Sequence, residues 1–417
     1  MTIFNNTQHL DKFTSLSIFL VLGLLLSTEN FSVVIAAITS AISLILLFKY
    51  RSKIEWSKED KIFILCLSAY FISNIPMAIS DLGNFRYFRG ASRLVLCIPI
   101  YFYFKYLIET DRLYSKPLIF GVILGSTGAF ILACYQFFIE GRPRVDGFLY
   151  SINFGYLACT LAVMSLSLMT FKKHRTLLFI GFILSSSAMM MTLTRGAIIA
   201  LPLVVLSIIA LEYTRFGFLK SATALVLIVL ISISLYNTTA PFKNRVDFTV
   251  TEINNILSGD ISKAVSSGGR LMLWKASVEA FKESPITGLT YPERMVLNKK
   301  LAEDRAINQW TANVKRGHAH SQYFEQLASG GILGVFAIFF TVFFPMIYFF
   351  YHRKTSKAAY VGTFFVLTIA ICCLTEVALQ QNLISTYYGY MLALLFAVTQ
   401  LEVEKHRQEV TNVYSSS

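Results

Sequence analysis

Charged residues are scarce in this chain of 417 residues: only 15% are Asp, Glu, Lys or Arg, whereas 55% are hydrophobic and the mean hydropathy is +0.58. Such a composition excludes an ordinary soluble domain and indicates an integral membrane protein. Little sequence remains for a separate soluble catalytic domain, because each membrane crossing needs roughly 20 apolar residues. The bilayer is therefore expected to be part of the fold.

Cysteine and histidine are also rare, with six residues of each. All six cysteines fall inside apolar runs, which argues against disulfides and thiolate metal sites. No serine lies in a Gly-x-Ser-x-Gly pattern, which argues against a hydrolase built on a nucleophile elbow. No small-residue cleavage site follows the first apolar run, so this run is expected to remain as an uncleaved helix.

The apolar runs predict an all-α polytopic membrane protein with about twelve transmembrane helices. The predicted spans cover about residues 14–27, 31–48, 62–79, 91–109, 117–138, 152–170, 176–193, 196–213, 220–236, 330–351, 358–378 and 383–401. The chain thus divides into nine spans (1–236), a large outer loop (237–329), three further spans (330–401) and a tail (402–417).

The positive charges predict the orientation of these spans. With a cytoplasmic N-terminus, 19 of the 37 Lys and Arg residues fall in inner segments, 6 in short outer loops and 12 in the large outer loop. Long loops escape the positive-inside bias, so the contrast between the short loops places both termini in the cytoplasm. The same bias accounts for the formal charge of +13, and no nucleic acid is expected as a partner.

The large outer loop carries three helix signals. Four apolar residues at helical spacing predict an amphipathic helix that Pro285 ends: Leu271, Trp274, Val278 and Phe281. A second helix is predicted at about 293–304. A third begins near Ser321, which is interpreted as its N-cap, and runs toward Gly330 and Gly331.

Two of the six histidines, His318 and His320, are expected on the outer side, where the large loop returns to the membrane. A neutral imidazole at this depth can act as a general base on a membrane-borne reactant. The His-x-His spacing also fits zinc, but no outer cysteine or third outer histidine completes a site, so carboxylates would have to do so. A loop histidine without a chemical role is the plainer alternative.

Two arginines lie at predicted helix starts. Arg195 begins a span at its outer end, and Arg270 begins the amphipathic loop helix directly after two glycines. Guanidinium groups and unpaired helical N–H groups both attract anions, so the pair predicts a phosphate clamp. Arginines that snorkel or pair with a carboxylate are the alternative.

Five further arginines lie in short outer loops that the positive-inside bias should keep poor in cations: Arg86, Arg89, Arg93, Arg142 and Arg144. This excess calls for an anionic partner, either lipid headgroups or a lipid-linked pyrophosphate or phosphorylated glycolipid. Several outer acids could serve as salt-bridge partners instead: Glu29, Asp81, Asp146 and Glu376.

The chain resembles the bacterial O-antigen ligases, whose superfamily also contains O-antigen polymerases and bacterial O-oligosaccharyltransferases. The family signature is His, then Ser, Asn or Gln, nine residues, Gly, two residues, and Gly, Thr or Tyr. Here it reads His320-Ser321, nine residues, and Gly331-Ile332-Leu333-Gly334, at the end of the large loop. Thr194-Arg195 and Gly269-Arg270 are similar to the two other family positions.

The resemblance implies a cofactor-free glycosyltransferase of the bacterial inner membrane, with a periplasmic active site in and around the large loop. It would transfer O-antigen polysaccharide from undecaprenyl pyrophosphate to a lipid A-core acceptor, with inversion and without a metal ion. Arg195 and Arg270 would bind the pyrophosphate and His320 would take the acceptor proton. Glu325, about one helical turn beyond, is a candidate to orient His320, while His318 and the five loop arginines are candidates to bind substrate.

Two other functions remain open from the sequence. An O-antigen polymerase uses the same kind of donor, although polymerases more often lack the full signature. A polytopic transporter of a lipid-linked or anionic solute is allowed by the helix count. Against a transporter, the spans lack the ionisable residues at mid-membrane and the paired broken helices of a coupled carrier.

Overall fold

A computed structural model describes residues 7–108 and 111–416, and every regular element in these ranges is helical, as predicted. The first helices are α1 (Thr7–Gly23), α2 (Phe31–Lys49), α3 (Lys58–Ser73), α4 (Ile75–Ser80), α5 (Ala91–Val95), α6 (Ile98–Leu107), α7 (Asp111–Cys134), α8 (Ser151–Leu168), α9 (Arg175–Met191), α10 (Arg195–Leu211) and α11 (Tyr213–Thr238). The others are α12 (Ala240–Leu257), α13 (Ser267–Glu283), α14 (Tyr291–Glu303), α15 (Gln309–Ala312), α16 (Gln322–Ile338), α17 (Phe344–His352), α18 (Lys357–Thr375) and α19 (Asn382–Ser416).

Eight helices in the described part of the chain are long and apolar enough to cross a membrane: Phe31–Lys49, Lys58–Ser80, Leu113–Ile139, Ser151–Phe171, Gly217–Thr238, Gln322–His352, Lys357–Thr375 and Asn382–Asn412. The helices α9 and α10 are apolar but shorter. Together they indicate a multi-pass membrane protein. The count of twelve crossings and the periplasmic placement of the large loop stay predictions.

The apolar run at 91–109, predicted as one span, is not one continuous helix. In its described part, α5 ends at Val95 and α6 begins at Ile98. Pro99 is the second residue of α6; it has no N–H, and its ring would clash with a helical carbonyl four residues earlier, at Val95. Two short helices therefore replace the long one.

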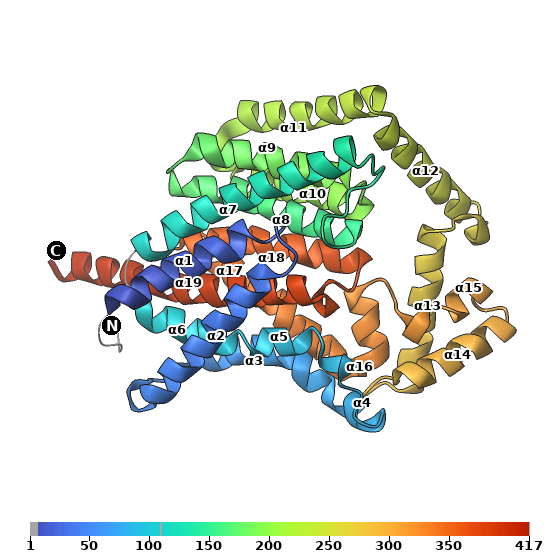
Figure 1. The fold of residues 1–417 in the computed structure, drawn as a ribbon, viewed down its shortest axis with the longest axis horizontal. Coiled ribbons are helices and arrows are strands. Elements are labelled where there is room, and N and C mark those ends of the chain that lie inside the picture. The colour runs from blue at the N-terminus through green and yellow to red at the C-terminus, as the bar shows by residue number, and fades with distance from the viewer. Residues whose placement is uncertain (1–6, 109–110, 417) are drawn as a thin grey trace.

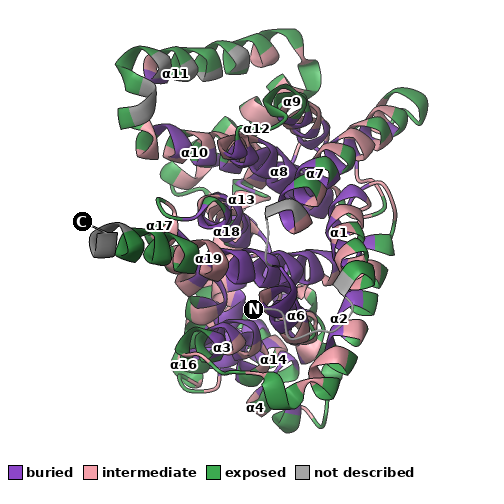
Figure 2. Ribbon diagram, turned by 90° about the vertical axis from the view of Figure 1, so that its left-hand side faces the viewer, coloured by how far each residue is buried: buried purple, intermediate pink, exposed green. Residues whose placement is uncertain are grey.

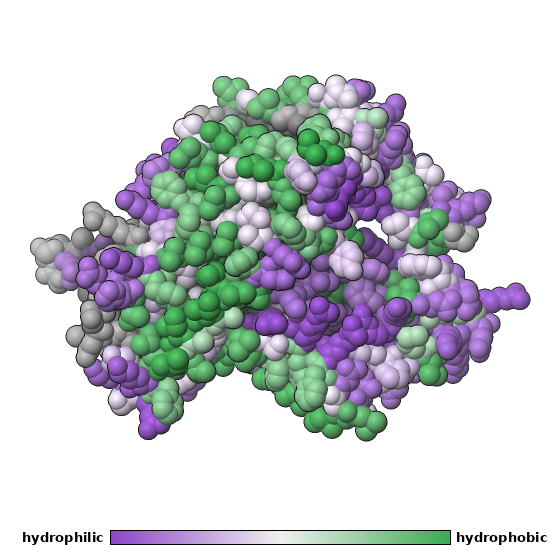
Figure 3. Space-filling model, viewed as in Figure 1, coloured by the Kyte–Doolittle hydropathy of each residue, from purple (hydrophilic) through white to green (hydrophobic). Residues whose placement is uncertain are grey.

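The buried core and the hydrophilic surface occupy different parts of the molecule. Buried residues concentrate along α8, α18 and α19, whereas α11 is mostly exposed (Figure 2). In Figure 3 hydrophobic side chains form a broad area from the top to the left of the centre, and hydrophilic ones predominate at the right, where Figure 1 shows α12–α15. The start of α1 and the end of α19 lie at the opposite end of the molecule from α12–α15 (Figure 1).

The helices of the large loop follow local sequence signals. The predicted amphipathic helix is confirmed as α13, and α14 begins at Tyr291 because Thr290 and Glu293 form a capping box. Ser321 is the N-cap residue of α16, as predicted, but its Oγ donates to the carbonyl of Cys373 at 3.4 Å and caps no N–H of its own helix. The sequence predicts no helix where α12 lies.

The signature glycines let α16 pack closely against the turn that follows α13. Gly331 interrupts α16 with φ +54° and ψ −140°, a conformation that favours glycine. The N–H of Ile332 donates to the carbonyl of Pro285 at 2.8 Å, and a Cβ on Gly331 would lie 2.5 Å from that oxygen. A Cβ on Gly334 would lie 2.1 Å from the carbonyl oxygen of Gln326. The glycines of the signature therefore have a structural role.

Candidate active site

The loop that precedes α16, residues 315–320 and here called the histidine loop, is held by a buried ion pair. Arg294 of α14 lies 2.8 Å from Glu325 of α16, and the two side chains are 3% and 1% exposed. Arg294 also donates to the carbonyl of Gly317. Glu325 accepts from the N–H of Ala319 at 2.8 Å. The pair thereby fixes the backbone on both sides of the first histidine.

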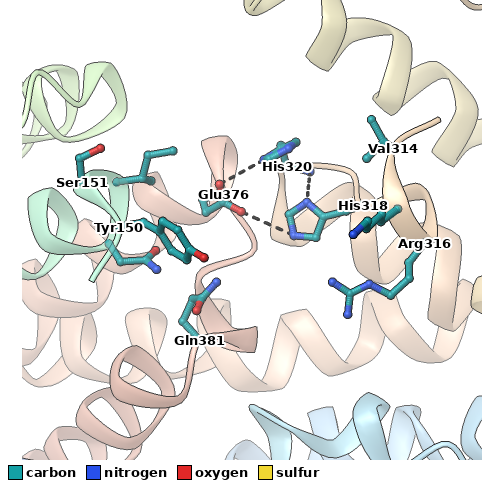
Figure 4. Close-up of a pocket in the computed structure, with 11 residues that line it drawn as sticks. Tyr150, Ser151, Val314, Arg316, His318, His320, Glu376 and Gln381 are labelled. Atoms are coloured by element: carbon teal, nitrogen blue, oxygen red, sulfur yellow. Dashed lines mark hydrogen bonds and ion pairs between the residues drawn. The ribbon is translucent and has the colours of Figure 1, made fainter. Parts of the chain in front are cut away.

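Glu376 follows the end of α18 and reaches both histidines (Figure 4). Its Oε2 lies 3.2 Å from Nδ1 of His320, and its Oε1 lies 3.6 Å from Nε2 of His318. An ionised carboxylate only accepts hydrogen bonds, so neutral His320 must carry its proton on Nδ1. Its Nε2 then keeps a free lone pair, has no hydrogen-bond partner within the described residues, and belongs to a side chain that is 34% exposed. This arrangement suits a general base.

Glu325, a candidate to orient His320, forms no hydrogen bond or ion pair with His320 within the described residues. Its carboxylate is bound by Arg294 and by the N–H of Ala319, and Glu376 contacts His320 instead. From the sequence, Glu376 is recognisable only as an acid at the outer end of a predicted span. A carboxylate directly after a long apolar helix is the one signal that could have singled it out.

The electrostatics of this cluster favour a neutral His318 beside an ionised Glu376. Nδ1 of His318 accepts from the N–H of His320 at 3.3 Å, and burial lowers the pKa of His318 despite nearby carboxylates. Burial by itself would raise the pKa of Glu376. The hydrogen bond from His320, the two imidazoles and the N–H of Val377 together outweigh burial and lower it.

The same three side chains could hold a metal ion. One donor atom from each of His318, His320 and Glu376 lies within 4.8 Å of the others. Two imidazoles and a carboxylate are a common set of zinc ligands. The sequence predicts that a carboxylate would have to complete such a site, and Glu376 supplies one. A metal ion bound through Nδ1 of His320 would, however, replace the hydrogen bond that orients this imidazole.

A cavity of about 440 Å³ opens beside the histidines. Its walls come from the start of α8, from the histidine loop and from the segment after α18 (Figure 4). Tyr150 and Gln381 lie across the cavity from the histidines, and Arg316 lies on the histidine side. The carbonyl of Ser151, which also lines the cavity, accepts from Oγ1 of Thr194 at 2.9 Å. The cavity thus adjoins the turn that leads into α10.

Four arginines, here called the arginine group, gather around this turn: Arg144, Arg195, Arg245 and Arg270. Arg144 and Arg245 donate to backbone carbonyls of the turn, at 3.0 and 3.2 Å. Burial, and then the charges of Arg195 and Arg144, lower the pKa of Arg245 to about 10. Burial and the charge of Arg195 also lower the pKa of Arg144. Cations that depress one another's pKa form a strong attractor for a multivalent anion.

Arg195 is already paired, which is one of the alternatives that its position allowed. Its guanidinium is 13% exposed and donates to Glu252 of α12 and to Oγ of Ser266, each at 2.5 Å. Burial would raise the pKa of Glu252, but the hydrogen bonds from Arg195 and from Ser266 and Ser267 lower it. The single ionised Glu252 therefore ties α10 to the start of α13.

Arg270 lies in the first turn of α13 and is half-buried. Its guanidinium has no hydrogen-bond partner within residues 7–108 and 111–416, so its donors remain available to a ligand. Arg195 bonds to Ser266 and Ser267 at the start of the helix that carries Arg270. The hydroxyl of Tyr156 on α8 forms a hydrogen bond with Oγ1 of Thr375, directly before Glu376, at 2.5 Å. A Cβ on Gly196, next to Arg195, would lie 2.6 Å from the same Tyr156 hydroxyl. The three residues predicted as catalytic therefore border one region.

Of the five loop arginines, Arg144 belongs to the arginine group and Arg142 does not. Arg142 pairs with Glu140 and Asp146 of its own loop, so its charge is already matched. Arg245, which no sequence pattern marks, occupies a place in the arginine group instead. A basic residue in α12 is a weak signal by itself, because the large loop holds 12 cations.

The other three loop arginines precede or lie in α5. Arg86 and Arg89 are exposed. Arg93 is half-buried, and its Nε has no hydrogen-bond partner in the described part of the chain. Arg86 lines a cavity together with a residue of the histidine loop, Arg316.

Comparison with known families agrees with the resemblance that the signature carries. Residues 180–339 match the O-antigen ligase family model. The matched residues 180–339, here called the O-antigen ligase segment, include Arg195, Arg270 and His320, whereas Arg144 and Glu376 lie outside them. The match implies an enzyme of glycan transfer, of the O-antigen ligase or polymerase kind, and suggests lipid-linked glycan substrates.

The chain is also similar to an uncharacterized protein of Haemophilus influenzae. The two are 26% identical over 328 residues, which cover 77% of this chain and 80% of that protein. This alignment is longer than the O-antigen ligase segment, so the similarity includes helices outside it.

Proposed function

We propose that this protein is an inner-membrane glycosyltransferase that transfers O-antigen polysaccharide from undecaprenyl pyrophosphate to a lipid A-core acceptor. The observation that carries the proposal is one juxtaposition. An imidazole whose Nε2 is free, oriented by Glu376, borders the same region as four arginines, of which Arg195 pairs with the carboxylate of Glu252.

The reaction is a single displacement at the anomeric carbon of the donor sugar. The acceptor hydroxyl forms the new C–O bond and gives its proton to Nε2 of His320. The bond to the pyrophosphate oxygen breaks, and undecaprenyl pyrophosphate leaves with the electron pair, so the anomeric centre inverts. A positioned base contributes on the order of 10²–10⁴-fold in rate. Glu376 keeps His320 in the required tautomer and stabilises the imidazolium that forms.

The arginine group stabilises the leaving pyrophosphate. Arg270 offers unpaired donors, and Arg195 is held at the start of α10 by Glu252. Guanidinium groups stay protonated and match phosphate oxygens in a planar fork, so they supply fixed positive charge without a metal ion. Arg245 and Arg144 extend this positive surface, and His318 supports the loop that carries His320.

Two features support the periplasmic orientation and the ligase assignment. The start of α1 and the end of α19 lie opposite α12–α15 (Figure 1), which fits cytoplasmic termini and a catalytic face on the other side. The signature from His320 to Gly334 is complete, and by resemblance this favours a ligase over a polymerase.

Deletion of the gene tests this assignment. We expect lipopolysaccharide from the deletion strain to lose all long chains on a gel while free lipid-linked polymer accumulates, and wild-type protein to restore them. His320→Ala should insert normally and restore nothing. A core that carries one repeat unit would identify a polymerase, and normal capped lipopolysaccharide with His320→Ala would reject the role of His320.

A further inference from the structure

A second cavity, of about 340 Å³, shares Arg316 with the histidine cavity. Its other walls come from the short segment between α4 and α5 and from the start of α14. Its lining includes Asp81, Asn84, Arg86, Tyr291 and Met295. The cavity therefore lies where a membrane helix, a helix of the large loop and the histidine loop meet.

Tyr291 gives this cavity a rigid aromatic wall. Its ring stacks on Tyr87 with 4.2 Å between the centroids and 7° between the planes. The hydroxyl of Tyr87 accepts from the N–H of Tyr291 at 2.8 Å and donates to Asp81 at 3.0 Å. Both residues are buried, with Tyr87 4% and Tyr291 8% exposed. A fixed aromatic side chain with a few polar groups around it is typical of small-molecule sites, sugars included.

The net charge available in this cavity is positive. Asp81 is already bonded to the Tyr87 hydroxyl and to Nδ2 of Asn84, at 2.9 Å. The guanidinium groups of Arg86 and Arg316 line the same cavity and form no hydrogen bond within the described residues. Two unpaired guanidinium groups in one cavity match the double charge of a phosphate monoester.

Arg316 is held in an unusual backbone conformation. Its φ is +63°, which is uncommon for an arginine, and its N–H donates to Sδ of Met295 at 3.2 Å. Its guanidinium lies 5.7 Å from the centre of the Tyr291 ring. Strain of this kind is retained where the surroundings enforce it, which is frequent at ligand sites.

We infer that this cavity is the acceptor subsite and binds a phosphorylated sugar of the acceptor glycolipid between Arg86 and Arg316. The inference rests on the proposed function. Because the donor pyrophosphate is assigned to the arginine group, donor and acceptor are held by separate sets of arginines. The bound phosphate holds the glycolipid beside Arg316, which both cavities share. The acceptor hydroxyl of the glycolipid then extends past Arg316 into the histidine cavity.

The test is a binding assay on the full chain in nanodiscs of neutral phosphatidylcholine. The probes are lipid A-core glycolipid, either native or treated with phosphatase. Wild-type protein and inactive His320→Ala should bind the native form more tightly. Arg316→Ala and the exposed Arg86→Ala should each bind the native form ~10-fold more weakly and the treated form equally well. Lys299→Ala, an exposed cation on α14, is the matched control and should behave as wild type.

Three outcomes would overturn the subsite: equal losses for both probes, no loss in either arginine variant, or a loss that appears only when phosphatidylglycerol is present. The last would identify a membrane headgroup as the ligand. Because binding is measured without transfer, the two proposals fail separately. Charge-dependent binding in a wild-type protein that transfers nothing rejects the proposed function alone. Normal transfer with an unchanged acceptor KM in Arg316→Ala rejects the subsite alone.

Discussion

Glu376 contacts His320 across 56 positions of the chain, with 3.2 Å between Oε2 and Nδ1. Two further bonds join the same segments. The N–H of Gln322 donates to the carbonyl of Glu376, and Ser321 Oγ donates to that of Cys373. The orientation of the proposed base is therefore set by the contact between the end of α18 and the start of α16.

Glu376→Gln should remove the charge that stabilises the imidazolium while it keeps the shape of the side chain. We expect the transfer rate to fall on the order of 10²–10⁴-fold with little change in the acceptor KM, because Glu376 acts through His320. Initial rates of the reconstituted reaction measure both quantities. Glu404→Gln, an exposed acid on α19, is the control. A wild-type rate in Glu376→Gln would remove Glu376 from the mechanism.

Arg270→Lys should keep the positive charge but lose the planar fork that binds two phosphate oxygens. We expect a loss of roughly 10²–10³-fold in kcat, comparable to removal of one transition-state donor. Lys282→Arg, at the other end of α13 and paired with Glu279 on the surface, is the control. Transfer by Arg270→Lys at the wild-type rate would indicate simple charge attraction instead of a shaped clamp.

Features that depend on local chemistry could be predicted from the sequence. Pro285 ends the predicted helix that the structure confirms as α13, and the spacing of the signature marks His320 as exceptional. The break at Pro99 also has a local cause, because a proline inside an apolar run is itself a signal that a helix ends or begins there. Periodicity, caps and prolines act within a few residues, so the sequence shows them directly.

Features that depend on contacts between distant elements could not be predicted. Glu376 reaches His320 only because α18 ends beside α16, and Arg294 matters only because α14 packs there. The same limit applies to Glu325. Its distance from His320 along the sequence suggests that the two side chains interact, but the packing of α14 brings Glu325 against Arg294. Arg245 gains its importance in the same way, from three arginines of other segments.

The stability of the protein should depend on pH through His318. Burial lowers the pKa of His318 in the folded chain below its unfolded value of about 6.5. Below about pH 6.5, His318 binds a proton in the unfolded chain but stays neutral in the folded chain. The free energy of unfolding therefore falls as the pH falls toward the pKa of His318 in the folded chain. His318→Gln should flatten this dependence in thermal unfolding at pH 7.5 and 5.5. The exposed His406→Gln should not, and equal slopes in all three proteins would contradict the prediction.

Chelation should leave transfer unchanged, because His320 is oriented by Glu376 and the leaving group is stabilised by arginines. Excess Zn²⁺ should inhibit, because His318, His320 and Glu376 can close around it and occupy the base. Rates measured with EDTA, with Zn²⁺, and with Zn²⁺ followed by EDTA separate the two effects. Inactivation by EDTA that a metal ion reverses would show instead that the three side chains hold a required ion.

The buried ion pair of Arg294 and Glu325 should contribute more to the position of the histidine loop than to the stability of the fold. Arg294→Met leaves a buried carboxylate unpaired and should lower the free energy of unfolding by about 3–5 kcal/mol. The double variant Arg294→Met/Glu325→Leu removes both charges and should recover most of that loss in thermal unfolding. It should still transfer poorly, because the carbonyl of Gly317 and the N–H of Ala319 lose their partners and the histidine loop is released.

The surface pair of Lys282 and Glu279 is the matched control for this double variant, and Lys282→Met should change stability by no more than about 1 kcal/mol. The decisive comparison is between the stability and the activity of the double variant. If it is stable and transfers at the wild-type rate, the ion pair does not position the histidine loop. If it is stable but slow, with acceptor binding retained, the loss lies in the placement of His320 relative to Glu376.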